Sequence, residues 1–245
     1  MGESPSRRDG EGNWTPAQQP DELRADIEQN LTTLGVDRLA AVNLRIHSGD
    51  PNAVGPVDRE LFDRQLDAMI AARDEGLIDG VGLSSISVEH LQIALERTDI
   101  ATVQNAYNLI SRPYETALAE VSLREDVALL AYSALGQGFL TGKYQNGARP
   151  VGARTTLFDR GQRYQKPGTE AAIDAYLAIA AEHGLDPAQM ALSFALSRGF
   201  MTSVILGATT MEQLKTDIAA QDVVLAPEVI EKIEAVDPTT GNPAP

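Results

Sequence analysis

Residues 59 to 85 read RELFDRQLDAMIAARDEGLIDGVGLSS, a helical pattern that runs directly into a strand. The apolar residues of the first part recur at helical spacing, and Gly76 follows as a helix C-cap would. The apolar stretch from Gly80 to Ser84 then favours a strand. A helix joined closely to a strand is the unit from which parallel α/β folds are built.

The same unit repeats along the chain. We predict helices at residues 21–34, 59–75, 88–97, 114–125, 169–183, 187–199, 211–220 and 227–235, and strands at 40–46, 80–84, 101–104, 127–132 and 203–206. Five strands that alternate with helices imply parallel pairing, hence a doubly wound sheet or a barrel. A doubly wound nucleotide-binding sheet usually carries a GxGxxG turn, which this sequence lacks. The pattern therefore favours a barrel, in which functional residues follow the carboxyl ends of the strands.

The polar composition of residues 1–20 predicts a flexible lead-in, since no apolar period could bury a face there. We expect the folded part to span residues 21–237 and a short C-terminal tail to span 238–245.

The charge balance limits the partners of this protein. With 35 acidic against 20 basic residues, the formal net charge is −15, which argues against binding to nucleic acid or to anionic membranes. The sequence has neither a membrane-length apolar run nor a signal peptide, so we predict a cytoplasmic protein. There are no cysteines and three histidines in separate segments, so we predict no metal site.

Four stretches at the strand ends carry a family resemblance. They are GLIDGVGLSS (76–85), VQNAYNLISRPYE (103–115), LLAYSALGQGFLTGKY (129–144) and VILGATTMEQL (204–214). In this order and spacing they resemble the aldo-keto reductase family, a (β/α)8 TIM barrel that reduces aldehydes and ketones with a nicotinamide cofactor. The resemblance covers residues 20 to 237 and implies a partial barrel consisting of strands four to eight with their helices.

The resemblance also implies a cofactor site. Ser84, Ser85 and Gln104 match residues that hold the nicotinamide carboxamide, although Ser85 replaces the usual Asn. Tyr132 matches the aromatic residue on which the nicotinamide ring stacks; without the resemblance it would be a core tyrosine at a strand end. The loop with Ser133, Leu135, Gly136 and Gly138 matches the pyrophosphate loop, and its glycines permit close approach of backbone N–H groups.

The adenosine end of this cofactor site corresponds to the turn and helix with Gly207, Thr209, Gln213 and Asp217, the last at a position where Asn is common. Family members that prefer NADPH often place a cation here, and no Lys or Arg lies between Gly207 and Gln213. The expected cofactor is therefore NADP(H) or NAD(H), with the choice left open.

The family's catalytic residues are an Asp, a Tyr, a Lys and a His, of which the first three come from barrel strands two and three. Since the first predicted strand matches the fourth of the family, these three have no counterpart in this sequence. Counting eight residues on from Asp37 places Arg45 at the family's His position. His47 lies two residues further, about 7 Å along a strand, and is either a second candidate or a solvated loop residue.

We therefore expect an NAD(P)H-dependent reductase of a small carbonyl compound with weak or absent turnover in this chain. Three origins of the partial barrel stay open: a longer enzyme read from a late start, which we favour, a decayed gene, or a fragment that closes by association. The alternative functions are a catalytically silent nicotinamide-binding or accessory module and a non-functional fragment. The substrate and the oligomeric state cannot be read from the sequence.

Overall fold

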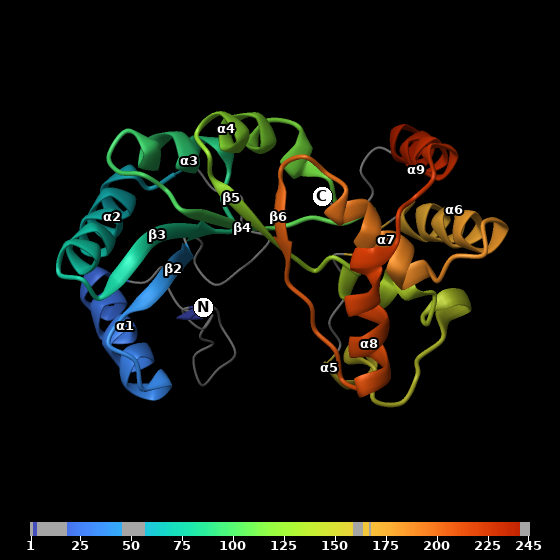
Figure 1. Ribbon diagram of the computed structural model, residues 1–245, viewed down its shortest axis with the longest axis horizontal. Coiled ribbons are helices and arrows are strands. Elements are labelled where there is room, and N and C mark those ends of the chain that lie inside the picture. The colour runs from blue at the N-terminus through green and yellow to red at the C-terminus, as the bar shows by residue number, and fades with distance from the viewer. Residues whose placement is uncertain (1, 4–18, 46–56, 159–163, 167, 241–245) are drawn as a thin grey trace. The chain divides into compact units, whose positions relative to one another are not determined.

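The computed structural model describes residues 2–3, 19–45, 57–158, 164–166 and 168–240 (Figure 1). Contacts within the chain define two compact units. The first unit comprises Met1–Asn105 and Leu118–Leu129, and the second comprises Ala106–Ala117 and Leu130–Pro245. Each unit has its own set of buried apolar side chains.

The strands follow one another in chain order, β1-β2-β3-β4-β5-β6. Their bounds are Gly2–Glu3 (β1), Leu39–Arg45 (β2), Ile78–Ser84 (β3), Thr102–Ala106 (β4), Ala128–Tyr132 (β5) and Met201–Val204 (β6). The pairs β1–β2, β2–β3 and β3–β4 are parallel, as expected where a helix returns the chain between strands. The α/β class with a parallel sheet is thus confirmed.

The helices fall close to their predicted positions. They span Pro20–Leu34 (α1), Arg59–Asp74 (α2), Val88–Leu95 (α3), Leu118–Arg124 (α4), Arg154–Phe158 (α5), Thr169–Glu182 (α6), Pro187–Leu196 (α7), Met211–Ala219 (α8) and Pro227–Thr240 (α9). Local chemistry sets their ends. Asp186, for example, accepts a hydrogen bond from the Gln189 backbone N–H at 3.0 Å and starts α7, and Gly35 ends α1 in the left-handed conformation at φ 65°.

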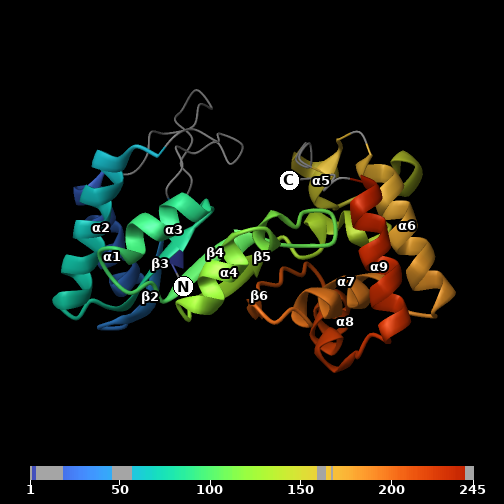
Figure 2. The ribbon, with the colours of Figure 1, turned by 90° about the horizontal axis from the view of Figure 1, so that it is seen from above.

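In the first unit, α1 and α2 lie side by side against β2 and β3 (Figures 1 and 2). The strand residues buried among apolar side chains alternate with polar ones: Leu44, Leu83 and Val103 are fully buried and occupy paired positions in the sheet. Because successive strand residues point to opposite faces, the residues on either side of them lie on the other face. This second face carries the polar residues considered below.

In the second unit, α6 packs on α9 (Figures 1 and 2). A buried charge network ties α9 to the segment after β4. Arg112, whose side chain is 5% exposed, pairs with Glu115 at 2.7 Å and with Glu234 of α9 at 2.6 Å, and Arg198 reaches the same Glu234 at 2.9 Å. This network fixes the segment from Tyr107 to Glu115, which follows β4.

Several elements differ from the sequence-based expectations. Strand β6 lies two residues earlier than the predicted strand at 203–206, and the predicted helix at 114–125 is divided into a 3-10 turn at Pro113–Glu115 and α4. Gly2–Glu3 forms β1 inside the predicted lead-in, because pairing through backbone groups needs no apolar pattern. Arg154–Phe158 forms the short helix α5, for which no prediction was made. Helix α9 runs to Thr240, past the predicted start of the tail at Pro238, although proline cannot donate an intrahelical hydrogen bond there.

None of the helices within the described ranges is long and apolar enough to cross a membrane. The predicted domain limits and the partial character of the barrel stay predictions.

Candidate functional site

Three predicted site residues of the first unit form one row across the sheet. Arg45 ends β2 and is in register with Ser84, which ends β3. Ser84 is in register with Gln104, which lies two residues before the end of β4. Residues in register on parallel strands point to the same face, with neighbouring strands about 4.8 Å apart. We call Arg45, Ser84 and Gln104 the strand-end row. The three residues of the strand-end row, which were predicted from the sequence, thus lie side by side in the fold.

The strand-end row contains polar atoms that the fold leaves unpaired. Ser84 is 3% and Gln104 6% exposed. The Oε1 atom of Gln104 and the Nε atom of Arg45 are buried and have no hydrogen-bond partner among the described residues. Leaving such a group unpaired costs about 1 to 3 kcal/mol. A ligand that offers both a donor and an acceptor would recover that cost.

A second polar row lies one pleat below the strand-end row. The Thr102 hydroxyl donates to Asn43 Oδ1 at 2.7 Å, directly across Gly82, which is in register with both. A Cβ atom on Gly82 would lie 2.3 Å from Asn43 Oδ1 and 2.3 Å from Thr102 Oγ1. Glycine is therefore required for this hydrogen bond. The bond links β2 and β4 two residues before the strand-end row.

Hydrogen bonds with residues of β4 fix the turn that follows β3. Ser85, at φ 58°, donates its backbone N–H to the Gln104 carbonyl at 2.9 Å. The Asn105 side chain accepts from the Ile86 N–H at 3.0 Å and donates to the Ile86 carbonyl at 2.9 Å. Ser85, which stands where the family usually has Asn, is thus placed in the left-handed region by fixed neighbours.

In the second unit, Asn108 holds the predicted loop at the end of β5. Tyr132 accepts a backbone hydrogen bond from Tyr107 at 3.3 Å, and Ser133 follows at φ 56°. The Asn108 side chain, 0% exposed, donates to the Ser133 carbonyl at 2.9 Å and accepts from the Ile110 N–H at 3.0 Å. Asn108 was not predicted as a site residue, although it stands inside the stretch VQNAYNLISRPYE.

The predicted pyrophosphate loop is built from unusual backbone conformations. Leu135 precedes Gly136 at φ 55° and Gly138 at φ 94°, so both glycines adopt conformations that other residues rarely take. A Cβ atom on Gly138 would lie 2.5 Å from Cε and 2.6 Å from Nζ of Lys143, whose ammonium lies 5.2 Å from the Tyr144 ring centre. Sequence reasoning missed Lys143; Gly138 makes room for this cation beside the loop.

The predicted adenosine residues behave differently from one another. Gln213 Oε1 accepts from the Thr209 N–H at 2.9 Å and the Thr209 hydroxyl at 3.0 Å, while Thr210 caps α8 by accepting from the Gln213 N–H at 3.2 Å. Gly207 is exposed. Asp217 is 6% exposed; burial, followed by the charge of Asp186, raises the pKa of its carboxyl, and Lys143 opposes this effect.

The charge network after β4 also involves Tyr107. Its hydroxyl donates to Glu115, and burial together with this hydrogen bond raises the pKa of Tyr107. Burial lowers the pKa of Arg112, but its hydrogen bonds to Glu115 and Glu234 outweigh this and raise it. Tyr107 therefore keeps its proton and Arg112 its charge near neutral pH, and both act as structural supports.

His47, the second catalytic candidate, lies outside the described residues. Arg45 is therefore the described candidate near the family's His position.

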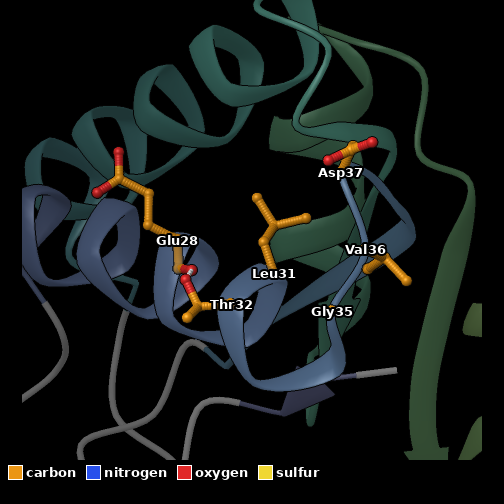
Figure 3. Close-up of a pocket in the computed structure, with 6 residues that line it drawn as sticks. All are labelled: Glu28, Leu31, Thr32, Gly35, Val36 and Asp37. Carbon is orange, nitrogen blue, oxygen red and sulfur yellow. Dashed lines mark hydrogen bonds between the residues drawn. The ribbon is translucent and has the colours of Figure 1, made fainter.

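A surface pocket of about 480 Å³ lies elsewhere in the first unit, where α1 leads into β2 (Figure 3). It is lined by Glu28, Leu31, Thr32, Gly35, Val36 and Asp37. This end of β2 is opposite to the strand-end row, since Asp37 precedes the strand and Arg45 ends it. The pocket is therefore not part of the candidate site.

A parallel α/β sheet with polar side chains toward the carboxyl ends of its strands is typical of α/β proteins that bind ligands at that edge. The model of the Aldo/keto reductase family matches residues 6–238, and the chain belongs to this family. Members of the family generally use NAD(P)H and act on small carbonyl compounds.

Individual relatives differ in how much of the chain they match. Protein tas of Escherichia coli K12 is 48% identical over 186 residues, covering 74% of this chain. The pyridoxine 4-dehydrogenase of Escherichia coli K12 is 27% identical over 231 residues, covering 94% of this chain and 69% of that protein. The chain spans 54% of the length of protein tas, about half of that relative.

The structure of a glycerol dehydrogenase from Gluconobacter oxydans is similar to this chain with a TM-score of 0.75. The match covers 96% of this chain and 69% of that one at 21% sequence identity, and it shows a shared fold.

Proposed function

We propose that this protein takes part in NAD(P)H-dependent reduction of an aldehyde or ketone, with the strand-end row holding the nicotinamide carboxamide. The observation that carries the proposal is the buried Gln104 Oε1 atom, which has no hydrogen-bond partner among the described residues. A carboxamide offers an NH₂ donor and a carbonyl acceptor. Its NH₂ group suits Gln104 Oε1, and the hydroxyl of the adjacent Ser84 is suited to donate to its carbonyl.

Family membership supports the other proposed cofactor ligands. Tyr132 is the proposed stacking partner of the nicotinamide ring, and offset stacking contributes on the order of 1 kcal/mol. The loop of Ser133, Leu135, Gly136 and Gly138 would face the pyrophosphate, and Gly207, Thr209, Gln213 and Asp217 would serve the adenosine end. When bound, the cofactor supplies the hydride; the chain's own residues bind and orient it.

The choice between NADPH and NADH follows from charge. No Lys or Arg lies between Gly207 and Gln213, and Gln213 Oε1 already accepts two hydrogen bonds. A 2′-phosphate would therefore find little compensating charge at this turn. We propose that the two reduced cofactors bind with affinities within about tenfold of each other.

A catalytically silent nicotinamide-binding module is the second candidate. Arg45 at the family's His position favours it, because a guanidinium keeps its proton and cannot act as an acid-base group near neutral pH. We expect this chain to bind the cofactor and to turn over weakly, because Arg45 cannot supply acid-base catalysis at that position.

Titration of NADPH and NADH fluorescence, followed by a turnover assay with a reactive aromatic aldehyde, tests both candidates. Tyr132→Ala should weaken cofactor binding about fivefold, whereas Tyr132→Phe, which retains the ring, should not. Absence of binding at millimolar cofactor would rule out both functions. Family-like turnover by this chain would exclude the silent module.

We also propose a cytoplasmic location and no nucleic-acid or membrane partner, in line with the net charge of −15. Fractionation of cells that express the tagged protein tests the location.

A further inference from the structure

We propose that Arg45 makes the site selective for carbonyl compounds that carry an anionic group, such as a carboxylate, near the carbonyl. The inference rests on the proposed function, since it names the substrate class of that site. It starts from the guanidinium that ends β2 beside Ser84.

Arg45 has a donor to offer. Its Nε atom is buried and has no hydrogen-bond partner among the described residues, and no ion pair of Arg45 is found among them either. A guanidinium presents Nε–H and Nη–H in a fixed fork that matches the two oxygens of a carboxylate. A carboxylate ligand would therefore satisfy the buried donor and gain a second hydrogen bond.

Three other arginines of the first unit are engaged in ion pairs. Arg24 pairs with Glu28 at 2.6 Å, Arg38 pairs with Asp79 at 3.1 Å, and Arg97 pairs with Asp63 at 3.0 Å. Arg24 lies on α1, and Arg97 follows α3. Arg38 precedes β2, at the end of the strand opposite to Arg45. Arg45 instead ends a strand at the row that is proposed to bind the carboxamide.

The sheet face around Arg45 is free of acidic residues on β2, β3 and β4. The residues that share its face on these strands are Leu39, Ala41 and Asn43 on β2, Ile78, Gly80, Gly82 and Ser84 on β3, and Thr102, Gln104 and Ala106 on β4. On β1, Glu3 is in register with Asn43. Glu3 is therefore an acidic residue to control for in the experiment.

The local cation outweighs the overall charge of the protein. The net charge of −15 repels anions, but salt screens exposed charges beyond about 8 Å at physiological ionic strength. A carboxylate in hydrogen-bond contact with a half-buried guanidinium is screened much less. A site with Arg45 would therefore accept an anionic substrate that the surface as a whole disfavours.

Two aldehydes of nearly equal shape test the inference. 4-Carboxybenzaldehyde carries a carboxylate, and 4-nitrobenzaldehyde carries an uncharged group of the same geometry. Their affinities are measured by titration calorimetry on the full chain, both with and without oxidised cofactor, which cannot donate hydride. We expect the carboxylate to bind at least about tenfold more tightly than the nitro compound, since a charge-assisted hydrogen bond contributes that much.

The variants separate charge from structure. Arg45→Met should abolish the preference, Arg45→Lys should retain part of it, and Arg64→Gln, which removes an exposed arginine of α2, should leave it unchanged. Thermal unfolding of each variant establishes that it is folded.

Several results would overturn the inference. An equal affinity of wild-type protein for the two aldehydes would do so, as would a preference that survives in Arg45→Met. A tenfold loss of cofactor affinity in Arg45→Met would make Arg45 a cofactor ligand instead. A tenfold gain of carboxylate affinity in Glu3→Gln would mean that Glu3 already neutralises Arg45. If the chain binds no cofactor, the proposed function fails, while the titrations without cofactor still decide the role of Arg45.

Discussion

The strand-end row of the first unit and the loop after β5 in the second unit contrast in how their polar groups are paired. Gln104 and Arg45 each keep a buried atom without a hydrogen-bond partner among the described residues. Asn108, in contrast, donates to Ser133 and accepts from the Ile110 N–H, so it is occupied in holding the loop. The row therefore has side chains available for a ligand, whereas the loop has its side chains engaged in shaping a backbone.

Because of this difference, substitutions in the two regions should have different effects on stability and on ligand binding. In the strand-end row, a substitution should weaken binding and not stability, because the unpaired atoms make no stabilising hydrogen bond in the folded state. In the loop after β5, a substitution should affect stability first, and binding through it. Four substitutions can break or sharpen this contrast.

Asn108→Ala should have the largest effect. It leaves the Ile110 N–H and the Ser133 carbonyl without their partner in a buried place and should lower the free energy of unfolding by about 2 to 3 kcal/mol. Urea denaturation measures this loss. Gln145→Ala, which removes an exposed hydrogen bond to Asp174, should stay within about 0.5 kcal/mol of wild type. Equal losses in both variants would contradict the structural role of Asn108.

Gln104→Leu should have the second largest effect, and it should lower cofactor affinity and not stability. Replacing a buried polar group that lacks a partner by an apolar one should leave stability unchanged or raised, while cofactor affinity falls about tenfold. Fluorescence titration and thermal unfolding measure the two effects. Gln92→Leu makes the same change at an exposed position of α3 and should leave the affinity unchanged. A large loss of stability in Gln104→Leu would remove the contrast between the two regions.

Gly138→Ala tests the loop geometry against Gly147→Ala. Both glycines have positive φ, 94° and 73°, so each substitution should cost about 1 kcal/mol. Only at Gly138 would the new Cβ displace the Lys143 ammonium, since Gly147 has open space around it. We expect weaker cofactor binding in Gly138→Ala alone. The same affinity in both variants would show that the position of Lys143 does not matter.

Asp217→Asn should have the smallest effect, a modest gain of stability at neutral pH. Burial raises the pKa of Asp217, so the folded state holds its proton more tightly than the unfolded state. Stability then falls as pH rises from the unfolded pKa through the raised one, and the cost is fully present above it. The gain of Asp217→Asn should therefore shrink as the pH is lowered toward the ordinary value of an aspartate.

Unfolding midpoints measured from pH 3.5 to 7.5 test this dependence. Asp222→Asn removes the same charge from an exposed site and serves as the control. A gain that is constant over the whole range in Asp217→Asn would contradict a raised pKa.

The sequence predicted the elements whose burial is periodic. Helix α2 and strand β3 have apolar residues at helical and strand spacing, because one face of each is buried in the first unit. Strand β1 has no such pattern, since two residues that pair through their backbone need no particular side chains. Its existence depends on β2 beside it and could not be predicted locally.

The positions of the candidate residues along the strands were predictable from the sequence, but their hydrogen bonding was not. The sequence predicted Arg45, Ser84 and Gln104 at strand ends, and the structure puts them in register, with β4 running two residues past Gln104. That Gln104 Oε1 is unpaired, or that Gln213 is engaged by Thr209, depends on contacts made in three dimensions. The role of Asn108 was missed because it binds Ser133, 25 residues away in the sequence.

The order of the strands has a consequence for how the chain folds. Since the sheet follows chain order, each strand can pair with one that has already been synthesised. Leu44 and Leu83, which are partners in β2 and β3, are separated by one helix and its connections. The entropy of closing such loops grows slowly with their length, and topologies rich in near-sequence contacts fold faster than those with distant pairings. The sheet can therefore assemble strand by strand as the chain leaves the ribosome.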